Sequence, residues 1–182
     1  SATFGDVGSL KTMWGYDLSH DDGTENAYIE QNGNYDQYAY FKDINSTEIY
    51  VEAEITVTNS TPFASDAYPK LGIQVSCEEN TIFFYVDADV SYTQKRVGCA
   101  QRKLDNSDWD WTATEKLYDV PNMVYAGGSY VKMAVYRDGD MFYYYINDQL
   151  IVAYNKFNVF NDTQEATCGF LSFNTGMKIR NY

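Results

Sequence analysis

The 182-residue sequence has little of several residue types, and the first shortage is of positive charge. It has 13 Lys and Arg residues against 26 Asp and Glu, giving a formal net charge of −13 at pH 7 and a sequence pI of about 4.3. A chain this acidic repels phosphate backbones and anionic lipid headgroups. No run approaches the roughly 18 consecutive apolar residues of a membrane span. We therefore expect neither a nucleic-acid partner nor insertion into a membrane.

Histidine and cysteine are also scarce. His20 is the single histidine, and no Gly-x-Ser-x-Gly motif accompanies it, so a nucleophilic triad has no support. Cys77, Cys99 and Cys168 form no Cys-x-x-Cys pair, which argues against a zinc site and a dense disulfide framework. Alternation places Cys77 and Cys99 beside apolar residues. We expect both to be small core residues, and a disulfide joining two of the three is the alternative.

The chain lacks an initiator methionine, a basic n-region and an apolar h-region at its start. We therefore expect a mature or excised segment, part of a larger secreted or surface protein. Its length and its 45% hydrophobic content fit one domain over residues 1–182.

Alternation of apolar and polar residues runs through almost the whole chain, and helical periodicity is nearly absent. Short polar turns such as Asp138-Gly139 and Asn147-Asp148 separate the alternating runs. Candidate strands lie at 27–31, 37–41, 48–58, 70–77, 81–89, 94–101, 130–137, 141–147, 150–154, 168–173 and 177–181. Region 105–128 breaks this rhythm and is expected to be a long connection. The pattern predicts an antiparallel β-sandwich.

The predicted hairpin at 130–152 has aromatic residues on both faces. Period-two alternation places one set of side chains in the core: Val131, Met133, Val135, Phe142, Tyr144 and Ile146. The same alternation leaves Tyr136, Tyr143 and Tyr145 on the opposite face. Three outward tyrosines on neighbouring strands form a flat adhesive surface, for which sugars are a natural partner.

Tyrosine is the most over-represented residue, with 18 copies in a chain that is 17% aromatic. The apolar face of a pyranose ring stacks on Tyr or Trp, while its hydroxyls need polar partners. The platform of Tyr136, Tyr143 and Tyr145 is continued by Phe83 and Tyr85 if their strands share the sheet. The predicted polar partners and rim residues are Gln74, Asp87, Arg96, Lys132, Trp109 and Trp111. The alternative is that region 105–128 folds over this face and makes it a second small core.

The order of these elements resembles the concanavalin A-like lectin and glucanase superfamily, in particular its laminin-G-like and carbohydrate-binding-module members. The resemblance is carried by segments 50–57, 71–75 with 81–87, 131–140, 142–151 and 168–174, and it covers residues 47–182. Asn147-Asp148 departs from the commoner Asn-Gly turn, although Asp also tolerates left-handed geometry. The resemblance implies an all-β, two-sheet antiparallel β-sandwich of jelly-roll type. Ligands in that superfamily commonly meet the concave sheet or the loops at its rim.

One segment, 48–54, is the nearest match to the acid-rich strand that glucanases of this superfamily use. Retaining glycosidases need two carboxylates about 5 Å apart. Here Glu52 and Glu54 share a face, but Tyr50 stands where the glucanase motif has its central Asp. Acidic residues on a solvent-facing strand usually serve solubility.

The loop around His20 carries several carboxylates that offer oxygen ligands for calcium, which are Asp17, Asp21 and Asp22. It lacks the Asp-x-Asp-x-Asp-Gly spacing of a dedicated calcium loop, so solvated acids are the alternative. We expect no required cofactor, with a structural calcium ion as the one metal that the resemblance suggests.

The hypothesis that follows is an extracellular or cell-surface, non-catalytic carbohydrate-binding module or lectin-like domain. It would bind a polysaccharide or oligosaccharide by aromatic stacking and hydrogen bonds to hydroxyls. Two alternatives remain open. One is a glycoside hydrolase of the same fold using Glu52 or Glu54, and the other is an adhesive module whose aromatic face docks a protein.

Overall fold

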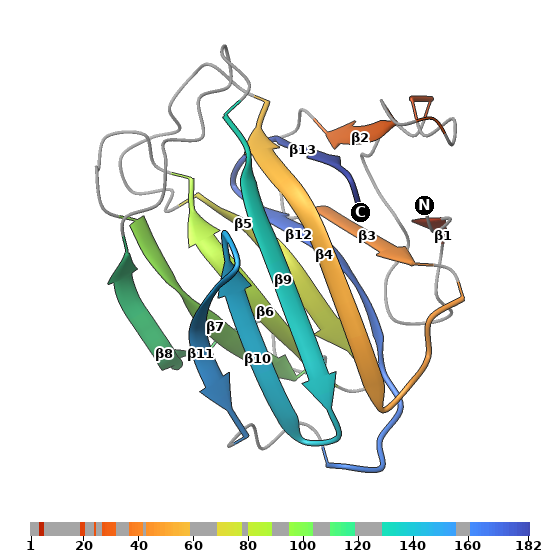
Figure 1. The fold of residues 1–182 in the computed structure, drawn as a ribbon, viewed down its shortest axis with the longest axis vertical. Coiled ribbons are helices and arrows are strands. Elements are labelled where there is room, and N and C mark those ends of the chain that lie inside the picture. The colour runs from red at the N-terminus through yellow and green to blue at the C-terminus, as the bar shows by residue number, and fades with distance from the viewer. Residues whose placement is uncertain are drawn as a thin grey trace.

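The computed structural model describes residues 4–5, 19–20, 24, 27–31, 37–41, 43–58, 69–77, 80–88, 95–103, 110–118, 129–155 and 161–182. This part of the chain is all-β and forms two antiparallel sheets stacked face to face (Figure 1). Within these residues, no helix has the length and apolar character needed to cross a membrane. The predicted fold class is confirmed.

The sheet nearer the viewer in Figure 1 has six strands. In spatial order they are β11 (Gln149–Tyr154), β10 (Met141–Ile146), β9 (Val131–Asp138), β4 (Glu48–Val57), β13 (Met177–Arg180) and β2 (Tyr28–Gln31). The second sheet has seven strands: β1 (Phe4–Gly5), β3 (Gln37–Phe41), β12 (Thr167–Phe173), β5 (Lys70–Ser76), β6 (Asn80–Asp87), β7 (Lys95–Lys103) and β8 (Asp110–Tyr118).

The main core lies between the two sheets and takes residues from β2 to β7 and from β9 to β13, for the most part alternate ones. The side chains predicted to point inward from the 130–152 hairpin all have no exposed surface: Val131, Met133, Val135, Phe142, Tyr144 and Ile146. Cys77, Cys99 and Cys168 are free thiols in this same core. The prediction that Cys77 and Cys99 are small core residues is therefore confirmed.

Two tight turns fix the meander of β9, β10 and β11. Gly139, with φ of 60°, and Asp140 connect β9 to β10, and Asp138 pairs with Met141 across the turn. Asn147 and Asp148 connect β10 to β11 with φ of 49° and 66°. Two left-handed residues in succession match the twist of a two-residue hairpin. Asp148 thus adopts the geometry that the sequence predicted for it.

All of the predicted strands are present, with ends that differ from the prediction by at most two residues. The prediction of a long connection at 105–128 is wrong in one respect, because β8 occupies residues 110–118 and pairs with β7. Two adjacent acidic-aromatic pairs, Asp108-Trp109 and Asp110-Trp111, obscured a run in which Thr112, Thr114 and Leu117 favour a strand.

In the seven-stranded sheet, β5 and β6 are buried on both faces, apart from half-buried Asp87. Alternation in β6 sends Phe84 to the main core and puts Phe83 and Tyr85 on the opposite face, as predicted, but neither has exposed surface. They belong to a second cluster: Tyr38, Tyr40, Phe83, Tyr85, Ala100 and Leu171, with Phe173 packed against it. Their predicted exposure is therefore wrong, because this face forms a second small core.

The strands of Phe83 and Tyr85 also lie in the other sheet from Tyr136, Tyr143 and Tyr145. The two groups face opposite sides of the sandwich, since each points away from the main core. A single platform containing both does not form.

Two glycines permit close approach between strands of the seven-stranded sheet. A Cβ atom at Gly72 would lie 2.0 Å from the backbone oxygen of Phe84, and one at Gly169 would lie 1.9 Å from the backbone oxygen of Ala39. No real side chain tolerates such distances. Glycine is therefore required at both positions.

Arg137 is fully buried at the end of β9 and binds backbone oxygens. Its Nε donates to Gly139 O at 2.7 Å, its Nη1 to Ser46 O at 2.9 Å, and its Nη2 to the carbonyls of Asn161 and Gln164. Burial lowers the pKa of this guanidinium. The side chain joins three separate segments at one end of the sandwich.

Candidate functional site

Three tyrosines form a line across the outer face of the six-stranded sheet, the face that points away from the main core. Tyr50 on β4 is directly opposite Tyr136 on β9, and Tyr136 is directly opposite Tyr143 on β10. Adjacent strands lie about 4.8 Å apart, so the three side chains emerge side by side. We call Tyr50, Tyr136 and Tyr143 the tyrosine row.

Tyr136 and Tyr143 are half-buried and stack on each other, with ring centroids 5.8 Å apart and planes inclined by 22°. The Tyr136 hydroxyl donates a hydrogen bond to Glu48 Oε1 at 3.0 Å. That bond is the main reason why the pKa of Tyr136 is raised. A carboxylate is thereby fixed at the edge of the stacked rings.

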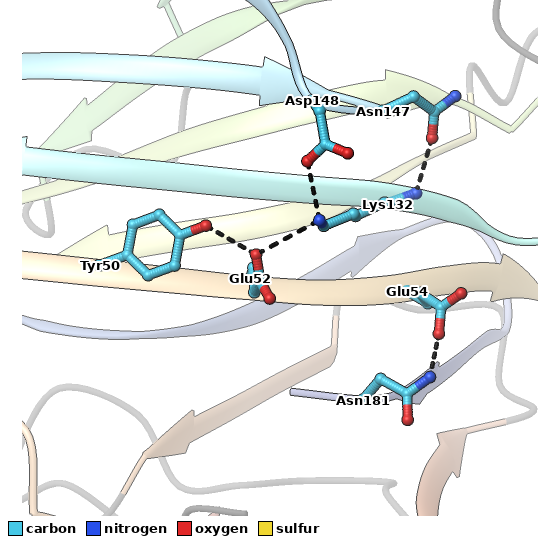
Figure 2. Close-up of polar contacts among 7 residues, drawn as sticks. All are labelled: Tyr50, Glu52, Glu54, Lys132, Asn147, Asp148 and Asn181. Atoms are coloured by element: carbon cyan, nitrogen blue, oxygen red, sulfur yellow. Dashed lines mark hydrogen bonds and ion pairs between the residues drawn. The ribbon is translucent and has the colours of Figure 1, made fainter.

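Tyr50 is the most exposed ring of the row, at 59% of its surface. Its hydroxyl donates to Glu52 Oε2 at 2.6 Å, as Figure 2 shows. The hydrogen bond to this carboxylate raises the pKa of Tyr50 to about 12. The hydrogen bond to Glu52 keeps the Tyr50 ring in place along β4.

Lys132 connects the carboxylate of Glu52 on β4 with that of Asp148 in the β10–β11 turn (Figure 2). Its Nζ lies 2.7 Å from Asp148 Oδ1 and 3.8 Å from Glu52 Oε2. The hydrogen bond that the Lys132 ammonium donates to Asp148 is the first cause of the raised pKa of Lys132. The Lys132 backbone N also donates to Asn147 Oδ1 at 3.1 Å, which ties the β10–β11 turn to β9.

Cations also cover aromatic rings at the far end of this face. Arg180 Nε lies 3.3 Å from Glu54 Oε2, and the Arg180 guanidinium lies over the Tyr130 ring at 3.6 Å. Lys178 Nζ lies 3.8 Å from the centre of the Tyr28 ring. These rings are already occupied by side chains of the protein, unlike the exposed ring of Tyr50.

Tyr145 lies on the outer face next to the row. It is opposite Ala134 on β9 and Leu150 on β11. Leu150 is 48% exposed, and the side chain of Ala134 is a single methyl group. Tyr145 is half-buried at this position.

The structure therefore brings together some of the predicted binding residues and separates the rest. The members that share the outer face of the six-stranded sheet are Tyr136, Tyr143, Tyr145 and Lys132. Trp111 lies in β8 of the other sheet, and Trp109 lies outside the described residues.

Four further predicted residues belong to the seven-stranded sheet, in addition to Trp111. Gln74 and Tyr85 are fully buried there, and Gln74 Nε2 donates to Phe170 O at 3.3 Å. Asp87 lies 3.2 Å from Lys70 and accepts a hydrogen bond from the backbone N of exposed Arg96. Burial raises the pKa of Asp87, and the Lys70 ammonium opposes that shift. These side chains have structural partners on the far side of the sandwich.

Sequence reasoning missed Tyr50 and Glu48 as site residues. The alternation of β4 had already placed Tyr50, Glu52 and Glu54 outward, so the signal for their direction was present. What the sequence did not show is that β4 pairs with β9 in the register that aligns Tyr50 with Tyr136. The pairing crosses more than 80 positions of the chain, which no local pattern encodes.

In the acidic segment of β4, both Glu52 and Glu54 have hydrogen-bonding and cationic partners. Glu52 accepts a hydrogen bond from Tyr50 and faces Lys132, while Glu54 accepts a hydrogen bond from Asn181 Nδ2 (Figure 2). Glu54 also pairs with Arg180. These cationic and hydrogen-bonding partners make both carboxylates part of a surface network.

The residues proposed for calcium, Asp17, Asp21 and Asp22, lie outside the described residues. Across the described ranges, His, Cys, Asp and Glu side chains form no group of three or more suited to a metal ion. His20 stacks on Tyr28, with ring centroids 4.4 Å apart. This contact gives the single histidine a packing role.

No family model matches the chain, and no curated protein matches it in sequence. Solved structures do match. A carbohydrate-binding module, CBM66 from Bacillus subtilis, aligns with a TM-score of 0.58 and 15% identity over 93% of this chain and 94% of that one. The carbohydrate recognition domain of Emp46p, in a potassium-bound form, aligns with a TM-score of 0.53 and 10% identity over 97% and 84%. These likenesses show the concanavalin A-like fold.

An enzyme is also similar in structure. Xylan β-1,4-xylosidase from Bacillus halodurans C-125 aligns with a TM-score of 0.57 and 9% identity over 87% of this chain. The aligned region is only 32% of that enzyme's chain. The fold thus occurs both in binding modules and within a hydrolase, and the likeness alone does not separate the two activities.

Proposed function

We propose that the protein is a non-catalytic carbohydrate-binding module or lectin-like domain that holds a glycan on the tyrosine row. The observation that carries the proposal is the alignment of Tyr50, Tyr136 and Tyr143 across three neighbouring strands. The concanavalin A-like fold and its likeness to carbohydrate-binding structures support it.

The chemistry of the row suits a sugar chain. An exposed Tyr50 ring offers a surface against which the C–H groups of a pyranose pack. Glu48, Glu52 and Asp148 offer acceptors, and Lys132 offers a donor, for the hydroxyls around the ring. The backbone beneath is a sheet, so these groups are held on a rigid support.

A binding role fits the carboxylates better than catalysis. Both Glu52 and Glu54 already have cationic and hydrogen-bonding partners on the surface. The second face of the seven-stranded sheet is closed in its described part, since Phe83, Tyr85 and Gln74 have no exposed surface. We place the protein outside the cell, as an attachment domain within a larger secreted or surface protein that needs no cofactor.

A glycan array followed by isothermal titration calorimetry tests the proposal. Tyr50→Ala and Tyr143→Ala should each weaken binding by about tenfold, since each removes one stacking ring. Tyr130→Ala is the matched control, because Tyr130 is covered by Arg180 at the other end of the face. Absence of any bound glycan on the array would overturn the proposal. Equal losses in the Tyr130 variant would show that the row is not the binding surface.

A further inference from the structure

We infer that the tyrosine row selects glycans that carry free amino groups over neutral and acidic glycans. The inference rests on the proposed function and adds the chemical class of the ligand. It comes from the negative charge around the row and from the hydrogen bond that joins the Tyr136 ring to the Glu48 carboxylate.

Carboxylates without a cation gather at one end of the row. Glu48, Asp138 and Asp140 are all exposed around the β9–β10 turn, and Glu48 is directly opposite Asp138 in the sheet. In the described part of the chain none of the three forms an ion pair. Lys132 and Arg180 do not compensate them, because each already pairs with other carboxylates on this face.

The aromatic groups add a second attraction for a cation. The stacked rings of Tyr136 and Tyr143 lie on β9 and β10. Asp138 at the end of β9 and Asp140 in the following turn lie where these two strands meet. The Tyr136 hydroxyl binds Glu48 directly, so a π-face and an uncompensated carboxylate adjoin each other. Ammonium groups are attracted to aromatic faces and form charge-assisted hydrogen bonds with carboxylates.

This combination distinguishes glycans by charge. The ammonium of a 2-amino-2-deoxy sugar would meet Glu48 and Asp138 while the ring packs on the tyrosine row. N-acetylation removes the positive charge and keeps the rest of the sugar. Uronic acids and sulfated sugars would be repelled by the same carboxylates and by the net charge of −13. The charge complementarity therefore identifies the amino glycan as the occupant.

Calorimetry with three oligomers of equal length and linkage tests the inference: β-1,4-linked glucosamine, N-acetylglucosamine and glucose hexamers. In a mildly acidic buffer, where the amines are protonated, the glucosamine hexamer should bind at least about tenfold tighter than the other two. Raising the salt concentration should weaken only this interaction, since exposed charges are screened over about 8–10 Å.

Two variants locate the effect. The double variant Glu48→Gln with Asp138→Asn should reduce the affinity for the glucosamine hexamer by at least about tenfold more than it reduces the affinity for the two neutral hexamers. Glu54→Gln is the matched control, because Glu54 pairs with Arg180 away from the row. A lysine hexapeptide that bound as tightly as the amino hexamer would overturn selection for a glycan.

The outcomes separate the inference from the proposed function. Equal affinity for the three hexamers would overturn the inference and leave the carbohydrate-binding proposal in place. Failure of every glycan to bind would overturn both. Loss of amino-glycan affinity in Glu54→Gln, with none in the double variant, would also refute the assignment to Glu48 and Asp138.

Discussion

At the scale of single residues, Arg137 has an unusual role for a buried charge. Its guanidinium donates to the carbonyl oxygens of Gly139, Ser46, Asn161 and Gln164, which belong to three separate segments. Its five N–H donors in a fixed plane allow one side chain to satisfy several carbonyls at once. The side chain therefore holds the turn end of the sandwich, next to the tyrosine row.

Replacing Arg137 tests this role. Arg137→Met leaves several buried carbonyls without their donor, so we expect the free energy of unfolding to fall by about 3 kcal/mol or more. Arg137→Lys should recover only part of the loss, because an ammonium lacks the planar fork. Urea unfolding followed by circular dichroism measures both. Arg180→Met, at a partly exposed position, is the control and should cost less than about 1 kcal/mol. A similar cost for Met at 137 and 180 would contradict the role.

At the scale of strands, alternation predicted most elements and their inward faces. It failed at β8, because Asp110 and Lys116 interrupt the apolar pattern, and at the two-residue β1. It also failed to show that Phe83 and Tyr85 are buried, since period-two reading tells which residues share a face and not what covers that face. Tyr136 and Tyr143 could be predicted as neighbours, because a short turn joins their strands. Tyr50 could not, because β4 pairs with β9 across a long stretch of the chain.

The close approach of β12 and β3 at Gly169 predicts that no larger residue can replace this glycine without moving a strand. In Gly169→Ala the new methyl group would meet the backbone oxygen of Ala39 at 1.9 Å, so β12 or β3 must move. We expect a loss of about 3 kcal/mol or more in unfolding free energy. Gly139→Ala serves as comparison, because its positive φ is strained but its nearest contact is 3.3 Å away. It should cost about 1 kcal/mol.

Denaturant unfolding of the two alanine variants measures this difference. If Gly169→Ala were no less stable than Gly139→Ala, the close approach of β12 and β3 would be refuted.

At the scale of the whole molecule, burial of a tyrosine hydroxyl and a cysteine thiol makes the free energy of unfolding fall as the pH becomes alkaline. Burial raises the pKa of Tyr40 from 10.0 to about 12 and the pKa of the Cys168 thiol from 9.0 to about 12. In this range the unfolded chain loses these protons before the folded chain does. Stability is therefore complete below about pH 9 and declines between pH 9 and 12 as deprotonation favours unfolding.

Urea midpoints between pH 8 and pH 11 measure this decline. Each buried group with a raised pKa contributes about 1.4 kcal/mol per pH unit across its own window. Tyr40→Phe should flatten the decline between pH 10 and 11, because phenylalanine has no proton to lose. Tyr50→Phe is the contrasting variant. The pKa of Tyr50 is raised by its hydrogen bond to Glu52, but the side chain is largely exposed. Loss of the Tyr50 hydroxyl should therefore change the slope of stability against pH little. A slope that Tyr40→Phe leaves unaltered would contradict the prediction.

The register of β4 against β9 has a consequence for how the surface comes into being. β9, β10 and β11 are joined by two-residue turns, so the stacked pair of Tyr136 and Tyr143 belongs to a local meander that closes short loops. Tyr50 arrives only when β4 crosses more than 80 positions of chain to reach β9. Such distant pairings slow the folding of β-sandwiches to milliseconds or longer. We therefore expect the pairing of β4 with β9, which brings the most exposed ring into the tyrosine row, to form later in folding than the local pairing of Tyr136 with Tyr143.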